Sequence, residues 1–128
     1  MKVNLIALVV CAVLFLAGCN AAETLEASYR QISTQEAVTM MAEETDYIIL
    51  DVRTQEEFAS GHIPDAINIP NEAIGTTEVP ELPNKDQLIL VYCRSGNRSK
   101  QASEVLKELG YTYIREFGGI IDWPYETE

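Results

Sequence analysis

The sequence has few residues that bind metal ions and few that carry positive charge. Its 128 residues include three cysteines and a single histidine, His62, and this leaves no set of side chains suited to a zinc cluster. Lysine and arginine together number 9 against 20 acidic residues, so the formal net charge is -11 at pH 7. Such an acidic chain argues against a nucleic-acid partner and against electrostatic docking on anionic lipid. We therefore expect neither a bound metal nor nucleic acid.

Long hydrophobic runs are also scarce, and the one present is too short to span a membrane. Residues 5–17 are all apolar, whereas a spanning helix needs about 20 such residues. This run follows a short basic start and has the length of a signal-peptide core. It ends in Leu16-Ala17-Gly18-Cys19, which resembles the bacterial lipobox. That resemblance implies cleavage before Cys19 and a lipid on its sulfur; an ordinary secretory signal and an uncleaved anchor are the alternatives.

The lipobox divides the chain into three parts and places it outside the cytoplasm. Residues 1–18 are expected to be a lipoprotein signal peptide, residues 19–28 the lipidated cysteine with a polar tether, and residues 29–128 a single folded domain. The expected location is the bacterial cell envelope, with the protein anchored to a membrane through lipid. Cys11 would leave with the signal peptide, so Cys93 would be the only free thiol. A lone thiol in an oxidising compartment is a liability unless it has a function.

The periodicity of residues 29–128 predicts an α/β domain. Apolar runs alternate with helical patterns, and Ser33/Glu36 and Thr54/Glu57 form capping boxes at two helix starts. This alternation favours a mainly parallel sheet, in which ligands gather beyond the carboxyl ends of the strands. The sequence contains no internal repeat. Strands are expected at 29–32, 47–52, 66–69, 88–92 and 111–117, helices at 33–44, 54–61 and 99–109, and a loop at 75–86.

The candidate reactive group is Cys93, which directly follows the strand predicted at 88–92 and precedes a short basic loop. Backbone N–H groups of such a loop, together with the positive end of the next helix, favour a thiolate. Arg94 and Arg98 are expected to add positive charge beside it, unless they pair with carboxylates from elsewhere in the fold. A buried, inert cysteine is disfavoured because polar residues follow it at once. A thiolate placed this way can attack electrophilic sulfur, phosphorus or carbon.

Several separated motifs, in order, resemble the single-domain rhodaneses, which are thiosulfate sulfurtransferase-like proteins. The resemblance extends from Ile32 to Trp123 and implies a parallel sheet of about five strands with helices on both faces. Asp65 stands where many family members have glycine. The matching segments are Leu50-Asp51-Val52-Arg53, Glu56-Glu57-Phe58, Gly61-His62-Ile63-Pro64, Ala66-Ile67-Asn68-Ile69-Pro70, Val91-Tyr92-Cys93-Arg94-Ser95-Gly96-Asn97-Arg98-Ser99 and Gly118-Gly119 with Trp123.

This resemblance implies an activity and a site. Cys93 would take a sulfane sulfur from thiosulfate or a persulfide donor, become a persulfide, and pass the sulfur to cyanide or a thiol. Arg94 and Arg98 would assist the anionic donor, and no metal or cofactor would be needed. The backbone N–H groups that would cradle the outer sulfur belong to Arg94, Ser95, Gly96, Asn97, Arg98 and Ser99.

Two other functions compete with sulfur transfer. Phosphatases of the same fold have a loop of the form Cys-x5-Arg, whereas Cys93 and Arg98 define a Cys-x4-Arg loop one residue shorter. The second alternative is a non-catalytic rhodanese-like module that binds a partner or senses redox state.

The remaining matched residues have supporting or packing roles. Asp51 and Arg53 are expected to order the strand end by hydrogen bonds, although a direct substrate role for Arg53 is also open. Arg53 also lies four residues before Glu57, a spacing that suits an ion pair on a helix. His62 is expected to be structural.

Overall fold

The computed structural model describes residues 27–75 and 79–128. The predicted signal peptide and the proposed lipid site at Cys19 lie outside these residues, as does most of the predicted tether. No helix in the described part of the chain is long and apolar enough to cross a membrane.

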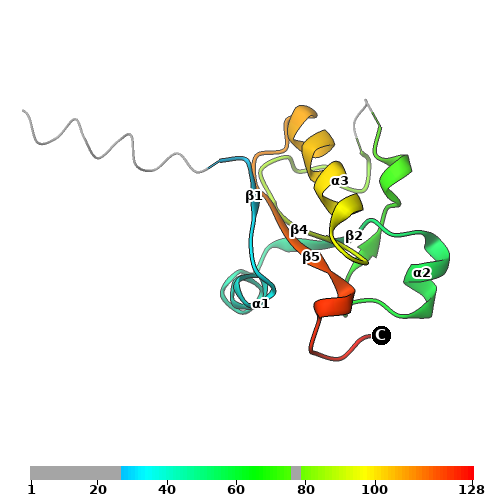
Figure 1. Ribbon diagram of the computed structural model, residues 1–128. Coiled ribbons are helices and arrows are strands. Elements are labelled where there is room, and N and C mark those ends of the chain that lie inside the picture. Colours follow the sequence, from blue (N-terminus) through cyan, green and yellow to red (C-terminus); the bar gives the residue numbers. More distant parts are fainter. Residues whose placement is uncertain (1–26, 76–78) are drawn as a thin grey trace, which may run out of the picture.

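A five-stranded sheet forms the centre of the domain, in the order β1-β5-β4-β2-β3, and every neighbouring pair is parallel. Figure 1 shows the strands at the middle of the molecule with helices around them. This arrangement confirms the α/β class and the parallel sheet predicted from the sequence. The strands are β1 (Tyr29–Gln31), β2 (Tyr47–Asp51), β3 (Ile67–Asn68), β4 (Leu88–Cys93) and β5 (Ile114–Gly119).

Helices cover both faces of the sheet, and each face has its own apolar core. Helix α1 (Thr34–Glu43) buries Ala37 against one face, together with Leu90 and Tyr92 of β4. Helix α3 (Asn97–Glu108) buries Ala102 and Leu106 against the other. The central strand β4 is therefore covered on both sides, and all its residues are buried, as expected for an interior strand of a parallel sheet.

Both predicted capping boxes are present and fix the starts of two helices. Ser33 caps α1, and its hydroxyl accepts from the N–H of Glu36 at 3.0 Å. Thr54 caps α2 (Gln55–Ser60) in the same way through Glu57, at 3.2 Å. Two short 3-10 turns, Asn71–Ala73 and Ile120–Asp122, complete the elements.

The structure corrects several predicted boundaries near Cys93. Helix α3 begins at Asn97, two residues before the predicted start, because Gly96 takes a left-handed conformation (φ 108°) and turns the chain directly into the helix. Strand β5 begins at Ile114 instead of residue 111 and continues through Gly119. Tyr111 is not in the strand: its hydroxyl donates to the carbonyl of Leu82 at 2.7 Å, which anchors the turn after α3. Strand β3 is also shorter than predicted, and β1 and β2 each end one residue early.

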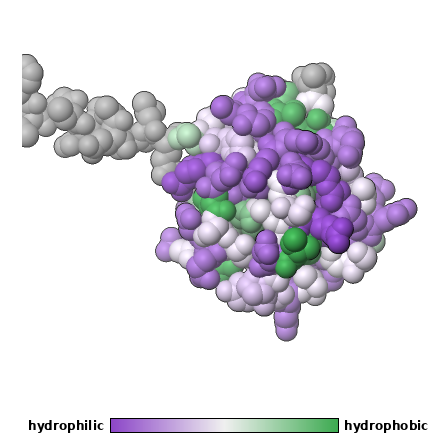
Figure 2. Space-filling model, viewed as in Figure 1, coloured by the Kyte–Doolittle hydropathy of each residue, from purple (hydrophilic) through white to green (hydrophobic). Residues whose placement is uncertain are grey.

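Hydrophilic side chains dominate the face of the molecule drawn in Figure 2, with small apolar patches between them. This agrees with the excess of acidic residues in the sequence. The large hydrophobic residues most exposed in the described ranges are Ile121 and Tyr125, both after β5.

Candidate active site

Cys93 lies at the carboxyl end of β4, between the ends of β2 and β5. Because these three strands are parallel, the residues that end them meet at one edge of the sheet: Asp51 from β2 and Gly119 from β5. The register between β4 and β5 shifts after Val91, and this irregularity sets Cys93 opposite Gly119. The sequence disfavoured a buried cysteine here, but Cys93 is only 1% exposed.

The loop after Cys93 folds back over its sulfur. The N–H of Gly96 donates to Sγ at 3.0 Å, and the Ser99 hydroxyl lies 3.3 Å from Sγ. Burial by itself raises the pKa of the Cys93 thiol, but hydrogen bonds from the Ser99 hydroxyl and from the N–H groups of Ser99, Gly96 and Ser95 outweigh burial and lower this pKa. The site therefore favours a thiolate although the sulfur is buried, and it does so mainly through hydrogen bonds.

Close contact with the end of β5 fixes the conformation of this loop. A Cβ atom placed on Gly119 would overlap the carbonyl group of Arg94 and crowd the Cα atom of Ser95. The same Arg94 carbonyl accepts from the N–H of Ile121 at 3.3 Å. A residue without a side chain at position 119 thus lets the loop lie directly against the strand.

The two arginines of the loop have different surroundings. Arg98 donates two hydrogen bonds to the carboxylate of Glu57, at 2.7 and 3.0 Å, so its charge is paired across 41 residues of sequence. This pairing, opposed by partial burial and aided by Thr54, lowers the pKa of Glu57 to about 2. The side chain of Arg94 is exposed at the rim of the loop, as are those of Ser95 and Asn97. The alternative in which a loop cation pairs with a distant carboxylate therefore holds for Arg98.

Asp51 and Arg53 form a buried ion pair at the end of β2. Arg53 Nη2 lies 2.7 Å from Asp51 Oδ2 and also donates to the carbonyl of Gly61 at 2.7 Å. Asn68 of β3 donates to the carbonyls of both residues, at 3.0 and 2.9 Å. The pair thus joins β2, β3 and the end of α2, which fits the expected ordering role. The spacing of Arg53 and Glu57 suggested a different partner: Arg53 pairs with Asp51, and Glu57 with Arg98.

Glu116 is a buried acidic residue of the site that the sequence analysis did not single out. It lies on β5, is 2% exposed, and accepts from the Ser99 hydroxyl at 2.8 Å and from the N–H of Gly118 at 2.9 Å. A signal existed in the sequence, because glutamate is uncommon within strands. What it contacts depends on α3, which brings Ser99 beside it.

His62 and Trp123 have structural surroundings. His62 stacks on Phe58 with 3.8 Å between ring centroids, and its Nδ1 lies 2.9 Å from the carbonyl oxygen of Phe58. The ring of Trp123 packs against Phe117, and its Nε1–H donates to the carbonyl of Glu126 at 3.1 Å. Both agree with the expected packing roles.

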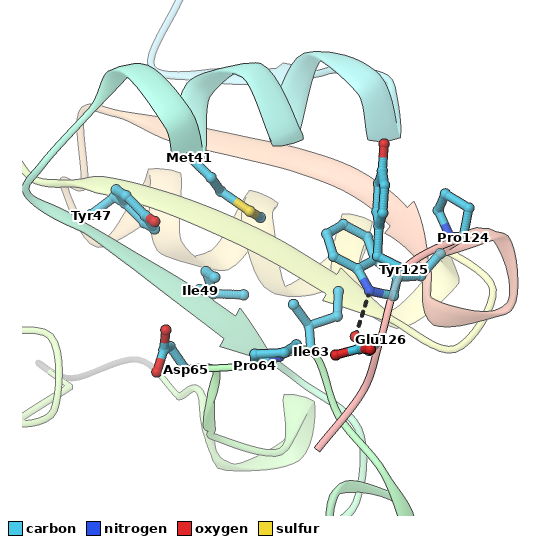
Figure 3. A pocket seen from close by; sticks show the side chains of 10 residues that line it. Met41, Tyr47, Ile49, Ile63, Pro64, Asp65, Pro124, Tyr125 and Glu126 are labelled. Atoms are coloured by element: carbon cyan, nitrogen blue, oxygen red, sulfur yellow. Dashed lines mark hydrogen bonds between the residues drawn. The ribbon is translucent and has the colours of Figure 1, made fainter.

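A pocket of about 770 Å³ lies on the α1 side of the sheet, and Cys93 does not line it. Figure 3 shows Tyr47 at one end of the pocket and Pro124 and Tyr125 at the other, with Met41 of α1 and Ile49 of β2 between them. Trp123 also lines the pocket. The Cys93 loop and this pocket therefore lie in different parts of the molecule.

Comparison with known proteins identifies the family of this chain. A family model described as a rhodanese-like domain matches residues 33–124. The chain is 38% identical over 73 residues to thiosulfate sulfurtransferase PspE from Escherichia coli, covering 57% of this chain and 70% of that protein. It is also 38% identical over 94 residues to a protein named sulfurtransferase from Allochromatium vinosum, covering 73% and 86%. The solved structure of a rhodanese-related protein from Thermoplasma volcanium matches with a TM-score of 0.65 at 32% identity, covering 78% of this chain and 98% of that one.

The chain therefore belongs to the rhodanese-like family, as its motifs predicted. The relatives named as sulfurtransferases, together with the thiol at the centre of the loop, support a rhodanese-type sulfurtransferase activity.

Proposed function

We propose that this protein transfers a sulfane sulfur from thiosulfate or a persulfide donor to a thiophilic acceptor through a persulfide on Cys93. The observation that supports this most strongly is the set of loop N–H groups, with the Ser99 hydroxyl, around Sγ of Cys93. Hydrogen bonds from these groups lower the pKa of a buried thiol. A thiolate held in this way is a nucleophile.

The transfer divides into two displacements at sulfur. With thiosulfate as donor, the Cys93 thiolate attacks the outer sulfur, a new sulfur–sulfur bond forms, and sulfite leaves with the electron pair of the broken bond. The acceptor, cyanide or a thiolate, then attacks the outer sulfur of the persulfide and restores the thiolate. Both forms of the enzyme are anionic at sulfur, so the same N–H groups of the loop stabilise each of them.

The rim of the loop supplies the charge that a dianionic donor requires. Arg94 is exposed at the rim of the loop, whereas the charge of Arg98 is paired with that of Glu57. In this proposal Arg94 attracts the donor, and Arg98 orients the loop while adding a weaker field. The N–H groups of Arg94, Ser95, Gly96, Asn97, Arg98 and Ser99 receive the outer sulfur.

Intact-protein mass spectrometry after exposure to thiosulfate tests the persulfide directly. The wild-type protein should gain the mass of one sulfur atom on Cys93, and cyanide should remove it with formation of thiocyanate. Cys93→Ser should show neither the adduct nor turnover. An unmodified Cys93 in a folded wild-type protein would reject sulfur transfer and leave the binding or redox-sensing module as the better account.

We also propose that the protein is a lipoprotein of the bacterial cell envelope, with lipid on Cys19. The apolar run of residues 5–17 followed by Leu16-Ala17-Gly18-Cys19 supports this. Full-length protein expressed in a bacterium should partition with membranes, and Cys19→Ala should release it or leave it unprocessed. Cys11→Ala is the matched control, since Cys11 lies within the signal peptide. Equal membrane retention and processing of the Cys19→Ala and Cys11→Ala proteins would contradict lipidation.

A further inference from the structure

Glu116, Ser99 and Cys93 form a continuous hydrogen-bonded chain inside the site. The Glu116 carboxylate and the Ser99 hydroxyl are joined at 2.8 Å, and the same hydroxyl oxygen lies 3.3 Å from Sγ of Cys93. Ser99 is completely buried, and Glu116 and Cys93 are 2% and 1% exposed. Two groups that can each carry a negative charge are thus separated by a single hydroxyl in a site closed to bulk water.

Ser99 has only one hydroxyl proton, and several acceptors compete for it. Besides Glu116, the carbonyls of Gly96 and Gly118 lie 3.0 and 3.4 Å from the hydroxyl oxygen. While Glu116 is ionised it is the strongest acceptor, so Ser99 donates to Glu116 and accepts from the thiol of Cys93. A Cys93 thiolate requires the opposite direction, with Ser99 donating to sulfur.

We propose that Glu116 and Cys93 share one proton through the Ser99 hydroxyl, so that Glu116 takes up the proton which the thiol must lose. This inference deepens the proposed function, on which it rests, by adding Glu116 as a positioning residue that acts through Ser99.

The transfer is balanced within the three groups. The Cys93 S–H bond breaks as its proton passes to the Ser99 oxygen, and the Ser99 O–H proton passes to the Glu116 carboxylate. Before the step the negative charge is on Glu116, and after it the charge is on sulfur, with Ser99 now donating to the thiolate. No net charge enters the buried site, which avoids the cost of placing two anions together there.

In the described residues, charged and titratable groups near this hydrogen-bonded series lie on β1 and on α3 itself. Tyr29 of β1 has its pKa raised, mainly by burial. The charges of Glu116 and Glu104 add to this rise, and a hydrogen bond with Gln31 opposes it. On α3, the amine of Lys100 lies 3.9 Å from the place a Cβ of Gly96 would occupy. Arg98 feels the charge of Cys93 but is bonded to Glu57.

Titration of Cys93 and Glu116 side by side tests whether the two groups share a proton. In the full-length protein, the Cys93 thiolate is followed by its ultraviolet absorbance and by its alkylation rate, with Cys11→Ala and Cys19→Ala present in every sample so that one thiol remains. Glu116 is followed by carboxyl-carbon NMR. Because the pair is coupled, we expect both groups to titrate over the same two steps in the parent protein.

Three variants should separate the groups. Glu116→Gln should leave one thiolate step, about one pH unit or more below the upper step of the parent protein, which means roughly tenfold more thiolate below that step. Cys93→Ser should leave Glu116 with one step instead of two. Ser99→Ala should uncouple the two groups while both remain. Glu104→Gln removes a charge from the same helix outside the chain and should leave both titrations unchanged.

The result that would overturn the inference is a Glu116→Gln thiolate titration that coincides with that of the parent protein, or a Glu116 titration that Cys93→Ser leaves unchanged. If Glu116→Gln does not fold, as judged by circular dichroism, the Ser99→Ala and Cys93→Ser titrations decide the question. The thiosulfate adduct measured on the same parent sample separates the two proposals. An adduct without coupled titration rejects only the shared proton, whereas no adduct rejects sulfur transfer itself.

Discussion

Cys93 combines burial with a lowered pKa at one residue. A buried thiol is ordinarily inert because burial disfavours its charged form. Here the N–H of Gly96 and the neighbouring donors of the loop reverse that preference and lower the pKa of Cys93. The lowered pKa at this position therefore depends on the loop conformation.

Substitution of Gly119 tests this dependence at a single residue. Gly119→Ala should lower sulfur transfer strongly and destabilise the fold by about 2 kcal/mol or more, because the new methyl group overlaps the carbonyl of Arg94. Thiocyanate formation and urea unfolding measure the two effects. Gly75→Ala is the matched control, since nothing lies within 4 Å of its Cβ position. Full activity of Gly119→Ala would show that contact with β5 does not set the loop.

The Asp51–Arg53 pair gives a second prediction at the residue scale. Asp51→Asn leaves the guanidinium of Arg53, which is 5% exposed, without its charged partner. We expect a loss of about 3–5 kcal/mol in the free energy of unfolding, because an uncompensated charge stays buried. Urea unfolding at neutral pH measures it, with the exposed Asp122→Asn as control. A loss no greater than that of the control would mean that the pair does not hold the end of β2 in place.

At the scale of elements, the ion pair between Glu57 and Arg98 joins α2 to the first turn of α3. Glu57 also completes the capping box of α2, so one carboxylate serves both the start of its own helix and the helix that follows Cys93. The sequence predicted the capping box from local spacing. It could not predict the bond to Arg98, because that bond depends on two helices meeting across 41 residues.

The pH dependence of stability should report this bond. The folded pKa of Glu57 is about 2, below its usual value of 4.5, so the bond stabilises the protein fully above about pH 4.5 and is lost as pH falls toward 2. Glu57→Gln should cost about 1 kcal/mol at neutral pH, since the pair is partly solvated, and should flatten stability between these pH values. Gln preserves the capping box, so the variant removes mainly the charge.

Denaturant unfolding as a function of pH provides the measurement, and Glu56→Gln is the control on the same helix turn. Glu56 is exposed and lies next to Glu57. If Glu56→Gln and Glu57→Gln showed the same dependence on pH, the stabilisation would come from general acidity of the helix start and not from Arg98.

At the scale of the whole molecule, the parallel sheet separates the chain entry from the reactive edge. β1 is parallel to β5 and pairs with its first residues, so the chain enters near the amino ends of the strands, while Cys93 lies at their carboxyl ends (Figure 1). The carbonyl of Ser28 already accepts from the N–H of Ile114 at 2.7 Å, so hydrogen bonding to the sheet begins just before β1. Residues 27 and 28 therefore lie at the edge of the sheet away from the thiol.

Truncation tests where the folded unit begins. A chain starting at Ala27 should unfold cooperatively with the same midpoint as the full-length protein, because it keeps β1 and the Ser28 contact. A chain starting at Ile32 should lose β1, expose the edge of β5, and unfold at a lower denaturant concentration. Circular dichroism during urea unfolding measures both. Equal midpoints for the two chains would mean that β1 contributes nothing to the sheet.

The sequence by itself determined the presence of most elements, their alternation and the position of Cys93 at the end of a strand. Capping boxes, apolar runs and the Cys93 loop are local patterns, and local patterns depend on residues a few positions apart. Only the tertiary structure decided that Arg98 is paired with Glu57, that Gly119 supports the loop, and that Glu116 reaches Cys93 through Ser99. Each of these contacts joins residues distant in the chain, and they meet because parallel strands bring their carboxyl ends, and the helices that follow them, to one edge of the sheet.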